Sequence, residues 1–106
     1  MVEQYGIYWV ELNPTKGSEM AKTRPCAVVS PEDLNAYLST VIIVPITSTI
    51  RNYPFRIGCH VSGRAGEIAA DQIRAIDKCR LKKQIGKLSE NEIEDLQDVL
   101  KRMLCE

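Results

Sequence analysis

Short runs of β-branched and aromatic residues follow one another along this chain, with only one short helical segment between them. They predict strands at residues 7–12, 26–30, 40–47, 55–61 and 67–76. Five or more short strands, no β-α-β alternation and a single helix at the end favour a small, strongly bent sheet or barrel. A length of 106 residues allows one core and no second one, so we expect a single domain over residues 1–106.

Two of the predicted strands contain local interruptions. Pro45 lies inside the third run and cannot donate a ladder hydrogen bond, which predicts a bulge or a sheet edge there. In the last run, the alternation of apolar residues changes phase near Asp71 and Gln72, as is typical where a strand bends. Gly63 and Gly66 predict a turn between the fourth and fifth runs.

Two segments are predicted to be helical. Residues 30–37 have Ser30 in the N-cap position, Pro31 at the first helical position and acidic residues in the first turn. Near the C-terminus, Ser89 and Glu92 have the spacing of a capping box. An apolar stripe at helical spacing follows, formed by Ile93, Leu96, Val99, Leu100, Met103 and Leu104. This stripe indicates packing against a core or an interface.

Composition excludes several classes of protein. Hydrophobic residues make up 44% of the chain and charged residues 26%, which is typical of a globular domain and not of a disordered one. The longest apolar run, residues 41–46, is far shorter than the roughly 18 residues of a membrane span. Met1-Val-Glu-Gln4 does not begin like a secretory signal. We therefore expect a cytoplasmic protein that has no membrane partner.

Cysteine spacing and charge distribution give weaker indications. None of the four cysteines forms a C-x-x-C pair, which favours buried or idle thiols over a metal or redox site; they are Cys26, Cys59, Cys79 and Cys105. Residues 1–89 contain 12 Lys and Arg against 8 Asp and Glu, whereas residues 90–106 contain 2 against 6. A positive groove for nucleic acid would explain this distribution. A solvated acidic helix face beside an ordinary domain explains it equally well.

The side chains left for chemistry are guanidinium groups and hydroxyls near strand ends. His60 is the only histidine, and no carboxylates or histidines have the spacing of a metal site or the setting of a Ser-His-Asp triad. A phosphate or RNA ligand suits Arg and hydroxyl donors, which are here Thr23, Arg24, Thr47, Ser48, Thr49 and Arg74. The long loop adds Lys16, Ser18 and Glu19. The alternative is that Arg24-Pro25 is an ordinary turn and that the hydroxyls only mark a strand end.

A polar segment of about a dozen residues, 13–23, joins the first two predicted strands. A tight hairpin needs only two residues, so this loop is long for such a small domain. From the residues alone, it is either a functional loop or a plain surface loop with solvated charges.

Several motifs resemble, in order and spacing, the MazF/PemK (Kid-like) family of toxin endoribonucleases. They are IYWVELNPTKGSE at residues 7–19, Thr23-Arg24-Pro25, AVVSP at 27–31, VPIT at 44–47, YPF at 53–55 and ADQIRAID at 70–77. The match extends through residues 85–89 and the final helix, so it covers nearly the whole chain. No single piece is specific, but their combination is.

The resemblance implies a mainly β fold with α: a small SH3-like barrel of strongly bent antiparallel sheet (CcdB/PemK-like) with a C-terminal helix, working as a homodimer. It implies sequence-specific, metal-independent cleavage of single-stranded RNA, chiefly mRNA, by an mRNA interferase that needs no cofactor. Attack by the RNA 2′-hydroxyl would leave a 2′,3′-cyclic phosphate and a 5′-hydroxyl. A cognate antitoxin protein would block the RNA groove.

By the same resemblance, Arg24 and Thr47 are the catalytic residues. The substrate-binding residues would be Lys16, Gly17, Ser18, Glu19, Thr23, Ser48, Asp71, Gln72 and Arg74. Residues 13–23 then form a flap over the RNA groove. The Kid branch places a His in this loop and an Arg just before the Asp-Gln pair, whereas Ser18 and Ala69 stand there in this chain. We therefore assign Asp71 to substrate positioning and not to base catalysis, with a structural role at a bend as the alternative.

Two rival functions fit the same fold. A toxin of the related CcdB type poisons DNA gyrase through a C-terminal Trp-Gly-Ile, but this sequence ends Leu104-Cys-Glu106. A non-catalytic SH3-like binding module would have lost the chemistry, and the presence of both Arg24 and Thr47 counts against it.

Overall fold

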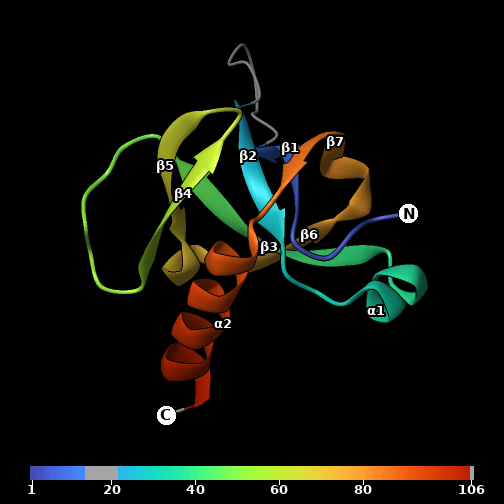
Figure 1. Cartoon of the computed structure of the whole chain (residues 1–106). Helices are drawn as coiled ribbons and strands as arrows, with labels where there is room; N and C mark the ends of the chain where they lie inside the picture. The colour runs from blue at the N-terminus through green and yellow to red at the C-terminus, as the bar shows by residue number, and fades with distance from the viewer. Residues whose placement is uncertain (14–21, 106) are drawn as a thin grey trace.

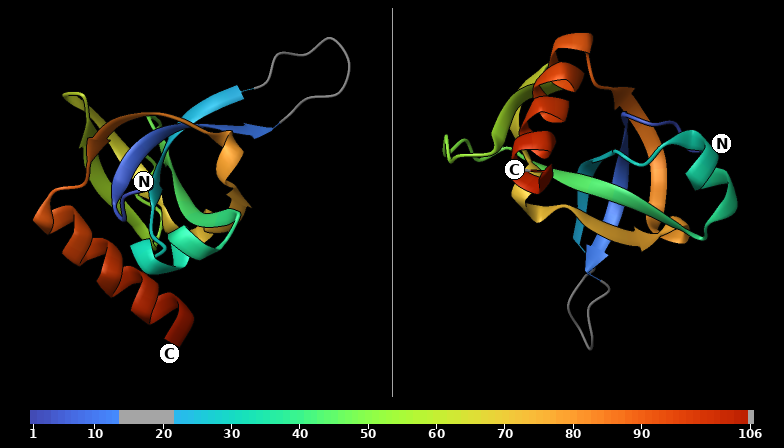
Figure 2. Two further views of the ribbon diagram at one scale, coloured as in Figure 1. Left: turned by 90° about the vertical axis from the view of Figure 1, so that its right-hand side faces the viewer. Right: turned by 90° about the horizontal axis from the view of Figure 1, so that it is seen from below.

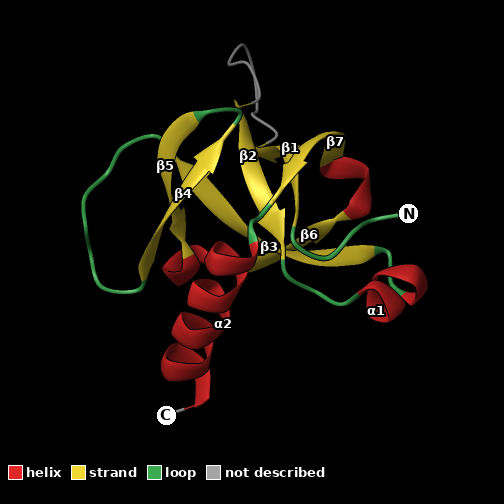
Figure 3. Cartoon of the chain, in the orientation of Figure 1, coloured by secondary structure: helices red, strands yellow, loops and turns green. Residues whose placement is uncertain are grey.

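Seven strands, a short helix, two single 3₁₀ turns and a long C-terminal helix make up the part of the chain that the structure describes. In this computed structural model, that part comprises residues 1–13 and 22–105. The elements are β1 (Gly6–Asn13), β2 (Lys22–Val28), α1 (Glu32–Tyr37), β3 (Thr40–Thr47), β4 (Arg56–Val61), β5 (Arg64–Ala69), η1 (Ala70–Gln72), β6 (Arg74–Asp77), η2 (Lys78–Arg80), β7 (Leu81–Lys87) and α2 (Glu90–Cys105) (Figure 3). No helix within these ranges is long and apolar enough to cross a membrane.

The strands form one antiparallel sheet that curls into a half-barrel (Figures 1 and 2). Its strand order is β4-β5-β3-β2-β1-β7, and β6 also pairs with β3. Helix α2 packs against β4 and η1. The expected small barrel of bent antiparallel sheet with a C-terminal helix is confirmed.

Strand β3 is the shared strand of the sheet. It pairs with β6 through Thr40–Ile43 and with β5 through Ile46 and Thr47, while its other side pairs with β2. Pro45 lies opposite Cys26 of β2, in the short interval between the pairings to β6 and β5. Pro45 was predicted to mark a bulge or a sheet edge; it lies inside the sheet, at a break between two pairings on one side of β3. A residue without an N–H is tolerated inside this strand because the ladder on one side is interrupted there.

Alternation along the strands sends side chains to two cores on opposite faces. In β1, Ile7 contributes to one core, whereas Tyr8 and Val10 contribute to the other. The first core lies under α2 and comprises Ile7, Ala27, Val44, Ile46, Ile57, Cys59, Ile68, Ala70, Leu88, Leu96 and Val99. The second comprises Tyr8, Val10, Leu12, Cys26, Val28, Val41, Ile43 and Ile76. Because β3 is buried on both faces, its apolar run is nearly continuous.

The capping box predicted for α2 is confirmed. The Glu92 N–H donates to Ser89 Oγ at 3.2 Å, and the Ser89 N–H donates to Glu92 Oε1 at 2.8 Å. The second carboxylate oxygen of Glu92 accepts the His60 N–H at 2.9 Å, which ties the start of α2 to β4. Leu96 is completely buried in the first core, and such burial contributes about 2 kcal/mol. Leu104 belongs to the predicted stripe but is 62% exposed, because the last turn extends beyond the sheet.

Three local predictions need correction. Residues 67–76 were expected to form one strand, but η1 divides them into β5 and β6 at the predicted phase break. Gly66 lies inside β5, and the turn is made by Ser62 and Gly63, both with positive φ. Residues 81–87 form β7, an edge strand that the sequence reasoning did not predict.

Ser30 does not cap α1 as predicted. Helix α1 begins after Pro31, which makes no side-chain capping bond. The buried Ser30 hydroxyl instead donates to Asn35 Oδ1 and accepts the Ile42 N–H at 3.1 Å. Asn35 Nδ2 donates back to the Ser30 carbonyl at 2.9 Å, so the pair joins α1 to β3.

Candidate functional site

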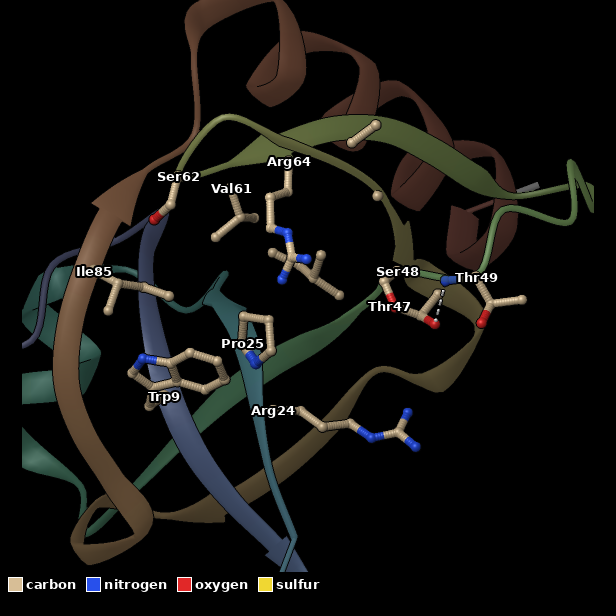
Figure 4. A pocket seen from close by; sticks show the side chains of 13 residues that line it. Trp9, Arg24, Pro25, Thr47, Ser48, Thr49, Val61, Ser62, Arg64 and Ile85 are labelled. Atoms are coloured by element: carbon tan, nitrogen blue, oxygen red, sulfur yellow. Dashed lines mark hydrogen bonds between the residues drawn. The ribbon is translucent and has the colours of Figure 1, made fainter.

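A pocket of about 570 Å³ is lined by residues from both end strands of the curled sheet, β4 and β7, and from strands between them. Its walls come from β1, β2, β3, β4, β5 and β7 and from the turns after β3 and β4. The lining residues are Trp9, Arg24, Pro25, Ile46, Thr47, Ser48, Thr49, Val61, Ser62, Arg64, Ala65, Gly66 and Ile85 (Figure 4). Segments far apart in the sequence thus meet in one concavity.

Arg24 and Thr47 reach this pocket from neighbouring strands. Arg24 lies in β2, where it pairs with Val10 of β1, and its side chain is exposed. Thr47 is the last residue of β3 and is half-buried. The Thr49 N–H donates to Thr47 Oγ1 at 3.1 Å, which fixes the direction of the hydroxyl oxygen (Figure 4). The hydroxyl proton of Thr47 is left to bond another acceptor.

The rest of the pocket combines apolar walls with a second cation. Trp9, which is 40% exposed, lies on the β1 side together with Ile85 of β7 and with Pro25 (Figure 4). The Arg64 guanidinium reaches over Pro25 from the other side of the cavity. An exposed indole offers a surface on which a base can stack, and a guanidinium offers planar donors for phosphate or a base edge. This arrangement suits a nucleic-acid strand.

Next to this pocket lies a cluster of three charged side chains. Arg56 Nε donates to Asp71 Oδ1 at 2.8 Å, and Arg56 Nη1 lies 3.7 Å from Glu67 Oε1. The hydrogen bond from Arg56 lowers the pKa of Asp71, and the backbone N–H groups of Arg51 and Asn52, together with Arg56, lower the pKa of Glu67. Both carboxylates are therefore ionised at neutral pH.

The predicted site residues fall into separate places. Arg24, Thr47 and Ser48 line the pocket. Lys16, Gly17, Ser18 and Glu19 lie outside the described residues. Exposed residues that do not line the pocket are Thr23, Asp71, Gln72 and Arg74. Arg74 instead lines a smaller hollow of about 160 Å³, together with Thr40, Ala75, Ile76, Asp77 and Arg80.

Sequence reasoning missed three residues of the site region. Trp9 shares the strand period of Ile7, so strict alternation along residues 7–12 would have placed it on that face. Arg64 follows a turn, and no local sequence pattern marks it as a site residue. Glu67 is a carboxylate inside an apolar run, and a buried charge of this kind signals a partner that is distant in the sequence.

The cysteine side chains are not arranged or activated for metal or redox chemistry within the described part of the chain. Burial raises the pKa of Cys26 to about 12 and that of Cys59 to about 11, so both are thiols at neutral pH. All four cysteines are free. Within the described ranges, no three His, Cys, Asp or Glu side chains gather as metal ligands do.

Known proteins resemble this chain over most of its length. Residues 3–104 match the family described as PemK-like, MazF-like toxin of type II toxin-antitoxin system. The chain is 35% identical to endoribonuclease MazF9 of Mycobacterium tuberculosis (strain ATCC 25618 / H37Rv) over 114 aligned positions, which cover 95% of this chain and 94% of that protein. It is 39% identical to the endoribonuclease toxin MazF of Escherichia coli (strain K12) over 70 residues; this match covers 66% of this chain and 63% of that relative, less than two thirds of its length.

The same fold occurs in a solved structure. The crystal structure of MazE-MazF from Deinococcus radiodurans matches with a TM-score of 0.85 and 24% sequence identity, covering 97% of this chain and 95% of that chain. That similarity concerns the fold alone. The family match spans nearly the whole sequence, and the chain therefore belongs to the PemK-like, MazF-like toxins of type II toxin-antitoxin systems.

Proposed function

We propose that this toxin is an endoribonuclease that cleaves single-stranded RNA, chiefly mRNA, at short sequence motifs and without a metal ion or cofactor. Two relatives are named endoribonucleases. The observation that carries the proposal in this chain is the convergence of Arg24 and Thr47 on one pocket. Residues 1–106 act as a single toxin domain in the cytoplasm, where mRNA is found.

The proposed chemistry needs little from the protein. The ribose 2′-oxygen attacks the adjacent phosphorus while the bond from phosphorus to the 5′-oxygen breaks. Water takes the proton of the 2′-hydroxyl and returns one to the 5′-oxygen, which leaves a 2′,3′-cyclic phosphate and a 5′-hydroxyl. The RNA supplies the nucleophile, so catalysis consists of orienting the phosphate and stabilising its additional negative charge. A guanidinium is a very weak acid, so Arg24 has the electrostatic role. Thr47 donates its hydroxyl proton to a non-bridging oxygen.

The remaining predicted residues position the strand. We assign substrate binding in the 13–23 flap to Lys16, Gly17, Ser18 and Glu19. We also assign substrate binding, at the groove, to Thr23, Ser48, Asp71, Gln72 and Arg74. The hydrogen bond from Arg56 lowers the pKa of Asp71 and so makes it a weaker base, which agrees better with positioning than with base catalysis.

Two protein partners belong to the proposal. The D. radiodurans toxin fold was solved as MazE-MazF, and we infer a cognate antitoxin that blocks the RNA groove here. We also infer a homodimer. Leu104, together with Ile50 and Tyr53 of the β3–β4 loop, leaves apolar surface exposed that would suit an interface.

The test is cleavage of a long single-stranded RNA by the purified protein in EDTA, with a DNA of matching sequence and the Arg24→Ala variant in parallel. We expect cuts at a recurrent short motif with cyclic phosphate ends. The DNA should stay intact, and so should the RNA that is incubated with Arg24→Ala. Intact RNA after incubation with a folded wild-type protein would refute the proposed activity, and cuts that vanish in EDTA would refute its independence of metal.

A further inference from the structure

Glu67 is a buried charge whose position the proposed chemistry does not explain. It is 3% exposed, and it lies in β5 directly opposite Thr47 of β3. Burying a carboxylate is costly unless hydrogen bonds and a counter-charge compensate it. The groups that bond the Glu67 carboxylate therefore indicate its role.

The partners of Glu67 lie in the loop that follows Thr47. Glu67 Oε1 accepts the Arg51 N–H at 3.1 Å, and Oε2 accepts the Asn52 N–H at 2.9 Å. Asn52 has a φ of 55°, a conformation that needs support in a residue other than glycine. The β3–β4 loop projects from the body of the molecule (Figure 1). The Glu67 carboxylate anchors it near its middle, at Arg51 and Asn52.

Glu67 thus holds the segment 47–52 at both of its ends. The backbone of Glu67 pairs with that of Thr47. The Glu67 carboxylate accepts the N–H groups of Arg51 and Asn52, which follow Thr47 by four and five residues. Within this segment, the Thr49 N–H orients Thr47 Oγ1. A Cβ on the preceding residue, Gly66, would lie 2.8 Å from the Thr47 carbonyl oxygen. Strand β5 therefore packs tightly against the backbone at the end of β3.

We propose that Glu67 is a positioning residue for Thr47: it holds the segment 48–52 so that the Thr49 N–H aims the Thr47 hydroxyl into the pocket. This inference rests on the endoribonuclease function proposed above. Arg56 provides the counter-charge that keeps the carboxylate in place. Glu67 touches the loop and not the RNA, so its removal acts on turnover through the placement of Thr47.

The test compares two carboxylates that each accept two backbone N–H groups. Glu67→Gln keeps the shape but leaves one N–H facing an amide NH₂ group. Glu92→Gln makes the same change at the start of α2, outside the pocket lining. We expect Glu67→Gln to lower kcat by about 10- to 100-fold with KM within about threefold, whereas Glu92→Gln leaves kcat unchanged.

A double-mutant cycle separates positioning from general destabilisation. Glu67→Gln should cost nothing further in a Thr47→Ala background, because its effect runs through Thr47, but should keep its full cost in an Arg24→Ala background. In hydrogen-exchange NMR, the Arg51 and Asn52 amides should be protected in the wild type and in Glu92→Gln, and should lose this protection in Glu67→Gln. If Glu67→Gln does not melt cooperatively, Glu67→Asp makes the same test, since it keeps the charge and withdraws the oxygens by one methylene.

Two results would overturn the inference alone: a Glu67→Gln enzyme that cleaves as fast as Glu92→Gln, or an equal loss with and without Thr47. A wild-type protein that folds and leaves RNA intact would overturn the proposed function and this inference with it.

Discussion

Two arginines on the same sheet have opposite surroundings. Arg56 in β4 is nearly buried, bonds Asp71, lies beside Glu67 and stacks on the Tyr53 ring with a guanidinium-to-centroid distance of 5.3 Å. Arg24 in β2 is exposed at the pocket edge, and no carboxylate within the described ranges forms an ion pair with it. Carboxylates of the same chain neutralise the charge of Arg56, whereas the charge of Arg24 is exposed at the pocket.

The difference separates two uses of one side chain. A guanidinium paired with a buried carboxylate holds elements together, because removing it leaves the buried charge without compensation. A guanidinium at a pocket mouth contributes little to folding but is well suited to bind a phosphate. The same substitution at the two positions should therefore have opposite consequences.

The largest effect is expected from Arg24→Met, which removes the charge and keeps most of the stem. Cleavage under single-turnover conditions should slow by about 100-fold or more, which corresponds to about 3 kcal/mol of barrier. The melting temperature should stay within about 2 °C of wild type, as for most surface changes. Arg102→Met on the exposed face of α2 is the control, and it should cleave like wild type. Cleavage by Arg24→Met within a few-fold of wild type would remove Arg24 from the catalytic site.

RNA affinity should depend strongly on salt. If about three phosphates are contacted, binding of a non-cleavable single-stranded RNA should weaken about 20-fold between 50 and 200 mM salt. Arg64→Gln should reduce the slope of log affinity against log salt by about 0.7, the share of one phosphate contact. Arg56→Met should leave this slope unchanged. A flat dependence, measured by fluorescence anisotropy, would argue against an RNA groove.

Arg56→Met should destabilise the fold. Asp71 and the buried Glu67 lose their counter-charge, and we expect the melting temperature to fall by about 5 °C or more. Arg24→Met is the matched comparison in the same calorimetric experiment. Equal melting temperatures for the two variants would mean that the ion pairs of Arg56 do not support the fold.

The smallest effect concerns acid stability. The pKa values of Asp71 and Glu67 are lowered in the folded protein from ordinary values of 3.8 and 4.5, so the unfolded state binds more protons near these pH values. Stability from these groups is present above about pH 4.5 and is lost progressively as the pH falls below it. Denaturation curves from pH 6 to pH 3 should show this loss in wild type and a shallower one in Arg56→Met. Parallel curves for both proteins would mean that the pairing of Asp71 and Glu67 with Arg56 does not contribute to stability at acid pH.

Local patterns predicted most of the fold. Alternating and continuous apolar runs identified β1 to β4, and the capping box identified the start of α2. Strand β7 was missed because three of its seven residues are Lys and most are exposed, as is common in edge strands. Ser30 was misassigned because its side chain bonds across to Asn35 and Ile42 and not to its own helix N-terminus.

The candidate site was less accessible to local reasoning. Arg24 and Thr47 were identified through resemblance, since neither Arg-Pro nor Ile-Thr is informative alone. Their meeting depends on the pairing of β2 with β3, which local propensity does not determine. The network of Glu67 joins residues 15 and 16 positions apart, and no spacing rule covers such contacts.

The pairing of β1 with β7 sets an order of events during synthesis. Nearly 70 residues separate the end of β1 from the start of β7, and ribosomes add about 5–20 residues per second. For several seconds a nascent chain therefore carries β1 without its outer neighbour, and the Trp9 side of the pocket lacks Ile85. The complete pocket exists only after most of the chain has left the ribosome that made it.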